Sequence, residues 1–495
     1  MNNLNFLVDV LKESPVFKTL EKNVKPGRTV CASGLSTINK SNIIYALCRL
    51  KGVTAFCLAS DEKEAQTLCN DLSCMGLRAY VYPVRDFNFL DFQSRSHEYE
   101  HARLKVLLKL LNHECDVAIA CVDAAAQLTV PRNVLEQSVI EFEEGRELSL
   151  EKATKALTLL GYERFDAVEG SGQFSLRGGI LDFFMPDSDY PVRCEFWGDE
   201  ITDLSYFDIE TQRRFKKADK ITLSPSTEIV IEDRAALADK IEHKAKLLRS
   251  KNSAKAKEKL FSEAELIRSG AMIANADKFI NQIYDKPESL FDYLDRNTLV
   301  FASEFTAIQE RGKSMDFISN ETLMQGFEDG TLCRGFDRFA LTFNECTEFL
   351  QSHGTIVLEN FVHGSMPIKL SEIISFSTKQ LSAWGGSYKQ LKEDVDGLFT
   401  PESKGVIFAG TERAAKNLCD TFNADGINAV YSEGADKISK GELLVMQGAL
   451  SAGFEYPSQK FFAITYSQVS YRPEKSKRRR KDGTGNLQLF RACPR

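Results

Sequence analysis

The sequence has no apolar run that approaches the roughly 20 residues that a membrane-spanning helix requires. Its first 17 residues also lack the form of a cleavable leader, because Asp9, Lys12 and Glu13 interrupt the apolar pattern. These two absences argue against an integral membrane protein and against a secreted one. They predict a cytoplasmic protein without a membrane partner.

Paired cysteine motifs are missing as well. The 12 cysteines are scattered, with no C-x-x-C pair and no paired spacing of Cys and His. The sequence therefore offers neither a disulfide framework nor a zinc-finger pattern. Cys57 and Cys121 lie inside apolar runs, a placement typical of small buried residues in a reducing compartment.

An excess of positive charge is also absent. The 495 residues carry 63 Lys and Arg against 70 Asp and Glu, which gives a formal net charge of -7. General attraction to nucleic acid is therefore excluded, and any such contact would come from a local patch or from a partner. With 43% hydrophobic and 27% charged residues, the composition is that of a soluble globular protein. The length predicts roughly three or four domains.

Short apolar runs alternate with amphipathic segments between residues 28 and 141. This alternation predicts a mostly parallel α/β sheet with helices on both faces. We expect the apolar run at 298–304 to rejoin that sheet, so that an antiparallel α+β module is inserted in between. A second, smaller α/β domain should follow. The expected boundaries are 1–141 and 221–340 for the two segments of the parallel-sheet domain, 142–220 for the insert, 341–468 for the small domain and 469–495 for a basic linker.

The first turn from strand to helix resembles a phosphate-binding loop. Residues 34–41 fit G-x-x-x-x-G-K-S with Gly34, Lys40 and Ser41, but Asn39 replaces the second glycine. That glycine lets the backbone N–H groups curl around phosphate. The other half of such a site needs an Asp after an apolar strand to hold magnesium, and the best candidate strand offers Ser303 there. The pattern predicts a degenerate nucleotide site in a phosphate-loop fold, with a working ATPase as the alternative.

A second motif resembles a zinc site. His97, Glu98 and His101 satisfy the H-E-x-x-H pattern, which would put both histidines on one face of a helix. No convincing third ligand follows, and the glutamates equally suit the first turn of a helix. A zinc hydrolase is therefore the weaker hypothesis, and no metal is expected.

The densest pattern lies between residues 172 and 214, where short apolar runs predict strands of an antiparallel sheet. Because side chains alternate along a strand, Arg193, Glu195 and Trp197 should share one side of it. Val192, Cys194 and Phe196 should face the core, and Arg177 in the neighbouring strand can join the outward row. Exposed Arg and Trp together suit a protein interface. The alternative is that Trp197 belongs to the core and the arginines are solvated.

Within this stretch, six short motifs form a recognisable set: Gly172-Gln173-Phe174, Arg177-Gly178-Gly179-Ile180-Leu181-Asp182, Pro191-Val192-Arg193, Gly198-Asp199-Glu200-Ile201, Phe207-Asp208 and Thr211-Gln212-Arg213. The set resembles the module shared by the excision-repair protein UvrB and the bacterial transcription-repair coupling factors (Mfd). The family often has an arginine two residues before the Phe-Asp pair, and Ser205 stands there instead, which removes one polar contact of the family pattern.

The resemblance implies a non-catalytic recruitment module, equivalent to the N-terminal part of a coupling factor. Such a module binds UvrA, the damage-recognition ATPase of nucleotide-excision repair, here through Arg177, Arg193 and Trp197. RNA polymerase and DNA are expected partners only through other regions of the full-length family, and no cofactor is expected. The alternative is an ATP-hydrolysing UvrB-like protein that binds damaged DNA.

The basic run at 472–481 is typical of a disordered linker. A contact with nucleic acid or polymerase is the alternative for this run.

Overall fold

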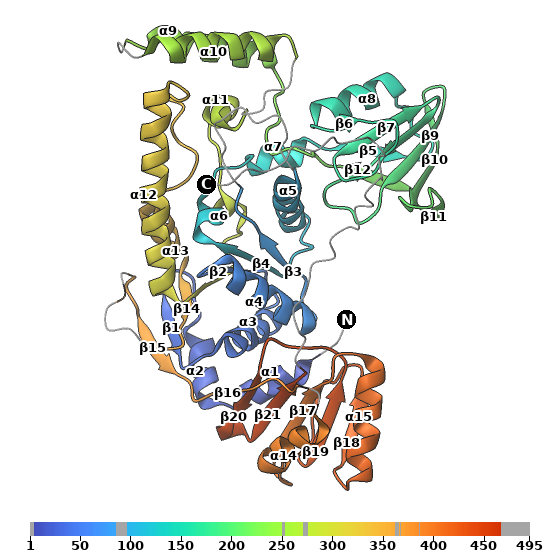
Figure 1. Cartoon of the computed structure of the whole chain (residues 1–495), viewed down its shortest axis with the longest axis vertical. Helices are drawn as coiled ribbons and strands as arrows, with labels where there is room; N and C mark the ends of the chain where they lie inside the picture. Colours follow the sequence, from blue (N-terminus) through green and yellow to red (C-terminus); the bar gives the residue numbers. More distant parts are fainter. Residues whose placement is uncertain are drawn as a thin grey trace, which may run out of the picture.

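The computed structural model describes residues 4–85, 97–249, 253–270, 276–361, 366, 368–385 and 387–466. Figure 1 shows a central parallel-sheet domain, the insert beside it, and a small α/β domain at one end of the molecule. The basic run at 472–481 and the tail predicted at 469–495 lie outside the described residues. None of the helices that the structure describes is long and apolar enough to cross a membrane.

The central sheet has seven parallel strands in the order β15-β1-β14-β13-β2-β4-β3. They are β1 (Val30–Ser33), β2 (Ala55–Ala59), β3 (Ala79–Tyr82), β4 (Val117–Cys121), β13 (Leu299–Ser303), β14 (Thr355–Leu358) and β15 (Glu372–Ser375). The inner strands are buried along their whole length because helices cover both faces, so each has a continuous apolar sequence. The predicted parallel sheet is confirmed, and β13 rejoins it beside β2.

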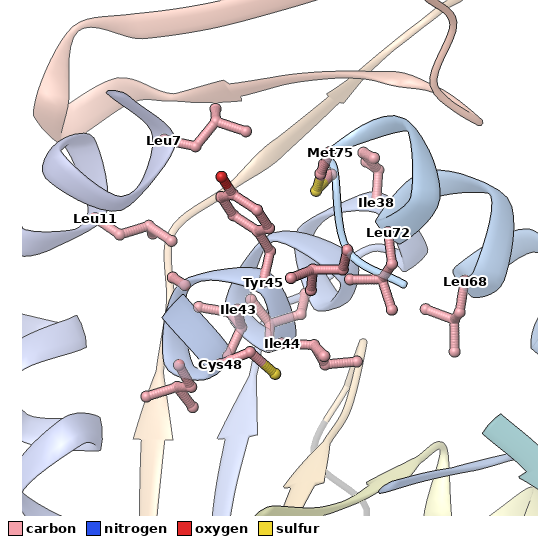
Figure 2. Close-up of a cluster of buried hydrophobic side chains, with 14 of the residues drawn as sticks. Leu7, Leu11, Ile38, Ile43, Ile44, Tyr45, Cys48, Leu68, Leu72 and Met75 are labelled. Carbon is pink, nitrogen blue, oxygen red and sulfur yellow. The ribbon is translucent and has the colours of Figure 1, made fainter. Parts of the chain in front are cut away.

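One face of this sheet carries α1 (Asn5–Lys12), α2 (Pro15–Asn23), α3 (Thr37–Lys51) and α4 (Glu62–Cys74). Figure 2 shows their shared core, in which Leu7 and Leu11 of α1 lie beside Tyr45 of α3. A second core fills the opposite face. It is formed with α5 (Glu98–Leu111), α6 (Val122–Ala126), α12 (Phe305–Asp329) and α13 (Phe343–His353).

The insert is built on a six-stranded sheet in the order β11-β10-β9-β8-β7-β6, antiparallel except between β6 and β7. Its strands are β6 (Glu163–Arg164), β7 (Gln173–Arg177), β8 (Ile180–Phe183), β9 (Val192–Trp197), β10 (Glu200–Phe207) and β11 (Arg214–Lys217). The helix α8 (Leu150–Leu159) packs on one face and closes an apolar core. The pair β5 (Ile140–Glu143) and β12 (Lys220–Leu223) forms a separate two-stranded sheet. The antiparallel α+β insert is therefore as predicted.

After the insert, α9 (Arg234–Leu247) and α10 (Ser253–Arg268) form a helical hairpin that Figure 1 shows at the end of the molecule opposite the small domain. The small domain has its own sheet in the order β16-β20-β21-β17-β19-β18. Its elements are β16 (Lys379–Leu381), α14 (Tyr388–Leu398), β17 (Lys404–Phe408), α15 (Glu412–Ala424), β18 (Ala429–Ser432), β19 (Glu442–Met446), β20 (Gly453–Tyr456) and β21 (Phe461–Thr465). A second α/β unit was expected, and it is present.

The strands β14 and β15 follow the predicted boundary at residue 341 but do not belong to the small domain. β14 and β15 belong to the central sheet, where Val30 of β1 pairs with Ile356 on one side and with Glu372 on the other. An apolar run of four residues predicts a strand but carries no information about its partner, because pairing is decided by tertiary packing. The chain therefore completes its first sheet before the small domain begins.

Candidate functional site

The outer face of the insert is the side of its sheet that carries Arg193 and Trp197, opposite the core under α8. In β9, Val192, Cys194 and Phe196 are buried, whereas the Trp197 residue is 82% exposed. This alternation is the one predicted from the sequence. The alternative that Trp197 belongs to the core is wrong.

One buried carboxylate organises this face. Asp182 of β8 lies opposite Arg193 in the sheet, and its side chain is only 1% exposed. Arg193 donates to it twice, from Nε at 2.7 Å and from Nη2 at 2.8 Å, and Arg177 of β7 donates once from Nη2 at 3.0 Å. Both predicted arginines therefore meet at one anion, which explains why they lie side by side.

Most of the remaining donors of Arg193 are also used within the insert. Nη1 donates to the Gln212 carbonyl at 3.2 Å and Nη2 to Gln212 Oε1 at 3.1 Å, while the guanidinium stacks 4.4 Å from the ring of Phe207. The hydrogen bond with Asp182 raises the pKa of Arg193 against the effect of burial. The Arg193 side chain is 13% exposed against 53% for Arg177. Arg177 and Trp197 are thus the accessible members of the predicted set.

Asp182 and Gln212 had no role predicted from the sequence, although both stand within the motif at 172–214. An acidic residue in the strand next to Arg193 was a usable signal, because cross-strand pairs of opposite charge are common. Gln212 offered no such signal, because its contact with Arg193 depends on how the turn after β10 folds.

The predicted nucleotide-site residues Lys40 and Ser303 also come together. The ammonium group of Lys40 donates to Ser303 Oγ at 2.9 Å, Glu304 Oε1 at 2.5 Å and Glu64 Oε1 at 3.4 Å. Lys40 is 1% exposed. In a phosphate loop this lysine would face the phosphates. Here two carboxylates surround it, and they would repel a nucleotide.

The turn before α3 is closed by the protein itself. Gly34 has φ +77°, and a Cβ there would lie 2.2 Å from the carbonyl oxygen of Phe376. Thr378 Oγ1 donates to the Gly34 carbonyl at 2.7 Å. Asn39 is fully buried and accepts a hydrogen bond from Ser36 Oγ at 2.7 Å. The segment after β15 therefore covers the loop that would hold phosphate.

The small domain packs over the same helix. Ser41 of α3 donates to Asp71 at 3.3 Å, and Ser451 of the small domain donates to Asp71 from N and from Oγ, both at 2.7 Å. Burial raises the pKa of Asp71 to about 6, while the bonds from Ser451 oppose the rise. Residues of β20, among them Phe454, join the apolar core that contains α3. All five residues predicted for the nucleotide site are therefore engaged inside the protein.

A pair of acidic residues completes this closed site. Burial raises the pKa of Glu359 to about 7 and the nearby Glu304 carboxylate adds to the rise, although Phe305 N donates to Glu359 Oε1 at 2.8 Å. For Glu304, burial is outweighed by the charge of Lys40, and its pKa is lowered. Glu359 directly follows the buried strand β14, a position that could have marked it in the sequence. Its partners could not be predicted.

The histidine motif has a structural role in the contact between α5 and the insert. His97 Nδ1 lies 2.9 Å from Glu100, and Glu100 accepts hydrogen bonds from Thr227 Oγ1 and from Glu228 N, both at 2.8 Å. Burial alone would raise the pKa of Glu100, but the hydrogen bond with His97, the charge of Arg85 and the hydrogen bond from Glu228 N hold it at about 2. The described residues contain no group of three or more His, Cys, Asp or Glu able to hold a metal.

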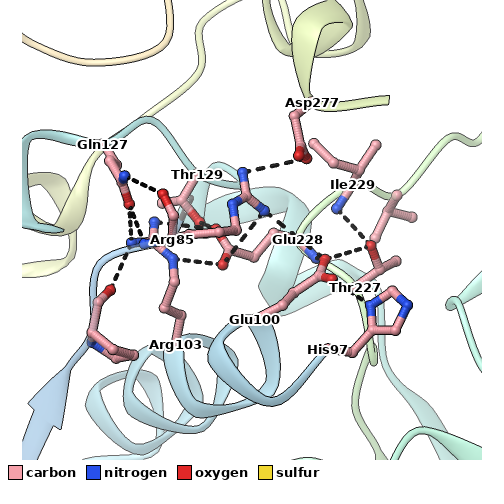
Figure 3. Close-up of polar contacts among 12 residues, drawn as sticks. Arg85, His97, Glu100, Arg103, Gln127, Thr129, Thr227, Glu228, Ile229 and Asp277 are labelled. Carbon is pink, nitrogen blue, oxygen red and sulfur yellow. Dashed lines mark hydrogen bonds and ion pairs between the residues drawn. The ribbon is translucent and has the colours of Figure 1, made fainter. Parts of the chain in front are cut away.

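Figure 3 shows the buried network that this contact belongs to. Arg103 of α5 donates to Glu228 from Nε at 2.7 Å and Nη2 at 3.3 Å, and to Gln127 from Nη1 at 2.8 Å. Thr129 also donates to Glu228, at 2.6 Å. Asp277, from the segment after the helical hairpin, lies 3.3 Å from Arg85. The network joins the central domain to the chain that returns from the insert.

Comparison with known proteins agrees with this architecture. A family model described as the UvrB interaction domain matches residues 140–229, which run from β5 to the Glu228 network. The insert and its outer face thus lie within a segment that is similar to the UvrB interaction domain.

The chain is similar to the transcription-repair-coupling factors over most of its length. It is 26% identical over 485 residues to the factor of Bacillus subtilis (strain 168), covering 95% of this chain and 41% of the relative. It is 21% identical over 500 residues to that of Staphylococcus aureus (strain NCTC 8325 / PS 47), covering 99% and 42%. The chain spans about two-fifths of the length of these curated relatives.

Proposed function

We propose that this chain recruits UvrA through the outer face of its insert and does so without hydrolysing ATP. In a coupling factor, the recruitment would bring UvrA to RNA polymerase stalled at DNA damage, with polymerase and DNA held by other regions of such proteins. The observation that carries the proposal is Trp197, which is 82% exposed on a UvrB interaction domain.

The chemistry of the outer face supports a protein partner. A flat, rigid indole that water surrounds in the free chain gains most when it fills an apolar pocket. Arg177 keeps donors available beside its single bond to Asp182, so it can pair with a carboxylate on UvrA. Arg193 would act mainly by holding Asp182, since most of its donors are already used.

The non-catalytic part of the proposal rests on the surroundings of Lys40. A nucleotide site needs a cation and free backbone N–H groups where the phosphates lie. Lys40 is buried between Glu64 and Glu304, and the loop at Gly34 is packed against Phe376. We therefore expect no ATP turnover from this chain, including in an Asn39→Gly, Ser303→Asp double variant.

Titration calorimetry of the chain against UvrA tests the proposal, with ATP turnover measured on the chain alone. Trp197→Ala should weaken binding by roughly 2 kcal/mol or more, and Arg177→Ala by roughly 1 kcal/mol or more. The matched control is Phe317→Ala, which removes a 65% exposed aromatic residue from α12 and should leave the affinity unchanged. Absence of binding, or an equal loss in the control, would refute the recruitment role. Turnover that depends on Lys40 would favour a UvrB-like ATPase instead.

A further inference from the structure

Arg214 makes the second charged cluster of the outer face. It lies on the edge strand β11, where its guanidinium pairs with Glu195 of β9 and, at 2.9 Å, with Asp203 of β10. One cation therefore serves two carboxylates. Glu195 stands two residues before Trp197, on the same side of the same strand, so this cluster borders the exposed indole.

The path of the Arg214 side chain depends on a small residue. In the sheet, Arg214 lies opposite Phe207, and Ser205 stands between Phe207 and Asp203 on the same side of β10. A side chain that starts beside Phe207 and ends at Asp203 passes over Ser205. Ser205 is 4% exposed although it belongs to the solvent side; it lies opposite Arg193 in the sheet, and its Oγ donates to Asp203 at 3.2 Å. A long side chain at position 205 would occupy the same path.

We infer that Arg214 is a positioning residue of the docking surface, acting as a strap over Ser205 that neutralises Glu195 and Asp203 beside Trp197. The inference rests on the proposed function, because it concerns the same surface. Arg177 on β7 and Arg214 on β11 then lie on the same side of the sheet as the indole. The complementary partner surface is an apolar slot with acidic groups at its rim.

Electrostatics predicts what the strap contributes. Without Arg214, Glu195 and Asp203, which are 35% and 26% exposed, would lose the cation between them, although Asp203 would keep the hydrogen bond from Ser205 Oγ at 3.2 Å. They would repel an acidic rim on the partner, mostly by slowing association, and salt would screen that repulsion. The loss of affinity for UvrA caused by removing Arg214 should therefore shrink at high ionic strength. The loss of affinity caused by removing Trp197 should not shrink, because it comes from apolar burial.

The experiment compares Arg214→Ala with Arg213→Ala, a neighbouring exposed arginine of equal charge. Affinity for UvrA is measured at 50 mM and 500 mM salt, and the thermal unfolding of each variant is recorded. At low salt we expect Arg214→Ala to weaken binding by about tenfold and Arg213→Ala by less than about threefold. At high salt the difference between the two should largely disappear.

A rescue variant separates positioning from a general loss of fold. The double variant Ser205→Arg, Arg214→Ala places a guanidinium near Glu195 and Asp203 again, now from β10 instead of β11. It should restore most of the affinity for UvrA. Equal binding by the unmodified chain and Arg214→Ala would overturn the strap alone. So would a loss that is independent of salt, or a failure of the rescue in a folded variant. No binding by the unmodified chain would overturn the proposed function and the strap together.

Discussion

Asp182 takes part in three hydrogen bonds from two arginines although its side chain is almost fully buried. A carboxylate removed from water in this way needs charged partners, and losing one is costly because the remaining charge stays buried. Arg193 donates two of these three hydrogen bonds, and its guanidinium also stacks on the ring of Phe207. Removing Arg193 should therefore lower the stability of the free chain far more than removing Trp197.

Arg193→Ala should lower the free energy of unfolding of the insert by about 2–4 kcal/mol, since Asp182 would keep only Arg177. Trp197→Ala should change it by less than about 0.5 kcal/mol, because the indole is exposed. Urea denaturation followed by circular dichroism measures both. A Trp197 variant less stable than the Arg193 variant would show that the indole is part of the fold.

Glu359 gives a pH dependence with a definite sign. Its pKa is raised from 4.5 to about 7 in the folded chain, so the folded state binds the proton more tightly than the unfolded state does. The stability that Glu359 contributes is complete below its unfolded pKa and is lost as the pH rises through about 7.

Glu359→Gln replaces the protonated form with a neutral amide that can still accept the bond from Phe305 N. Relative to the unmodified chain, this variant should gain roughly 1–3 kcal/mol of stability between pH 5 and pH 8. Denaturation midpoints at four pH values across that range measure the gain. A difference that stays constant with pH would show that Glu359 is not protonated in the folded chain.

At the scale of an element, the turn between β1 and α3 lies at the position of the predicted phosphate loop but is used for packing. Its glycine has a positive φ, which favours a residue without Cβ, and it lies against the segment after β15. The same helix ends at Gly52, which also has a positive φ, +63°, but a Cβ added there would meet nothing within 4 Å. Gly34 and Gly52 therefore make a matched comparison, because both have a positive φ but only Gly34 is packed against other atoms.

Gly34→Ala should destabilise the chain by about 2–4 kcal/mol, because strain at positive φ is added to a clash with the Phe376 carbonyl. Gly52→Ala should cost only the strain, about 1 kcal/mol. Thermal unfolding of the two variants compares them directly. Equal losses would mean that the loop can move away from Phe376, and that the site can open.

At the scale of the whole molecule, the Glu228 network holds the central domain, the chain that returns from the insert and the segment after the helical hairpin in one place. Arg103 and Glu228 both have side chains that are fully buried. Such a pair restricts how the insert sits on α5, and so does the close packing of His101 on Gly172, where an added Cβ would lie 2.6 Å from the imidazole. The orientation of the outer face of the insert is thus restricted by residues far from it.

Glu228→Gln should lower stability by about 3–5 kcal/mol, since Arg103 would remain buried without a counter-charge. Limited proteolysis should also cut the chain near residues 224–229 sooner, because the connection would open more often. Glu412→Gln, which breaks an exposed pair with Lys416, is the control and should change stability by less than about 0.5 kcal/mol. If Glu228→Gln and Glu412→Gln lowered the stability equally, the buried network would contribute no more than an exposed ion pair.

Local patterns in the sequence were sufficient for much of this protein. The alternation of Val192, Cys194 and Phe196 with Arg193 and Trp197 determined which side of β9 is exposed, because side chains in a strand have a period of two. The buried strands were recognisable because a sheet covered on both faces needs apolar residues throughout. The changed residues Asn39 and Ser303 predicted a degenerate nucleotide site, which stays a prediction until ATP turnover is measured.

Which residues contact one another was decided by the tertiary structure alone. The partners of Lys40 lie 24 and 264 residues away in the chain, and no spacing rule connects positions so distant. Arg193 could be identified as outward, but only the fold placed Asp182 and Gln212 where they use up its donors. The placement of β14 and β15 beside β1 was decided in the same way. Local periodicity determines the element and its exposed side, whereas long-range pairing depends on packing of the whole chain.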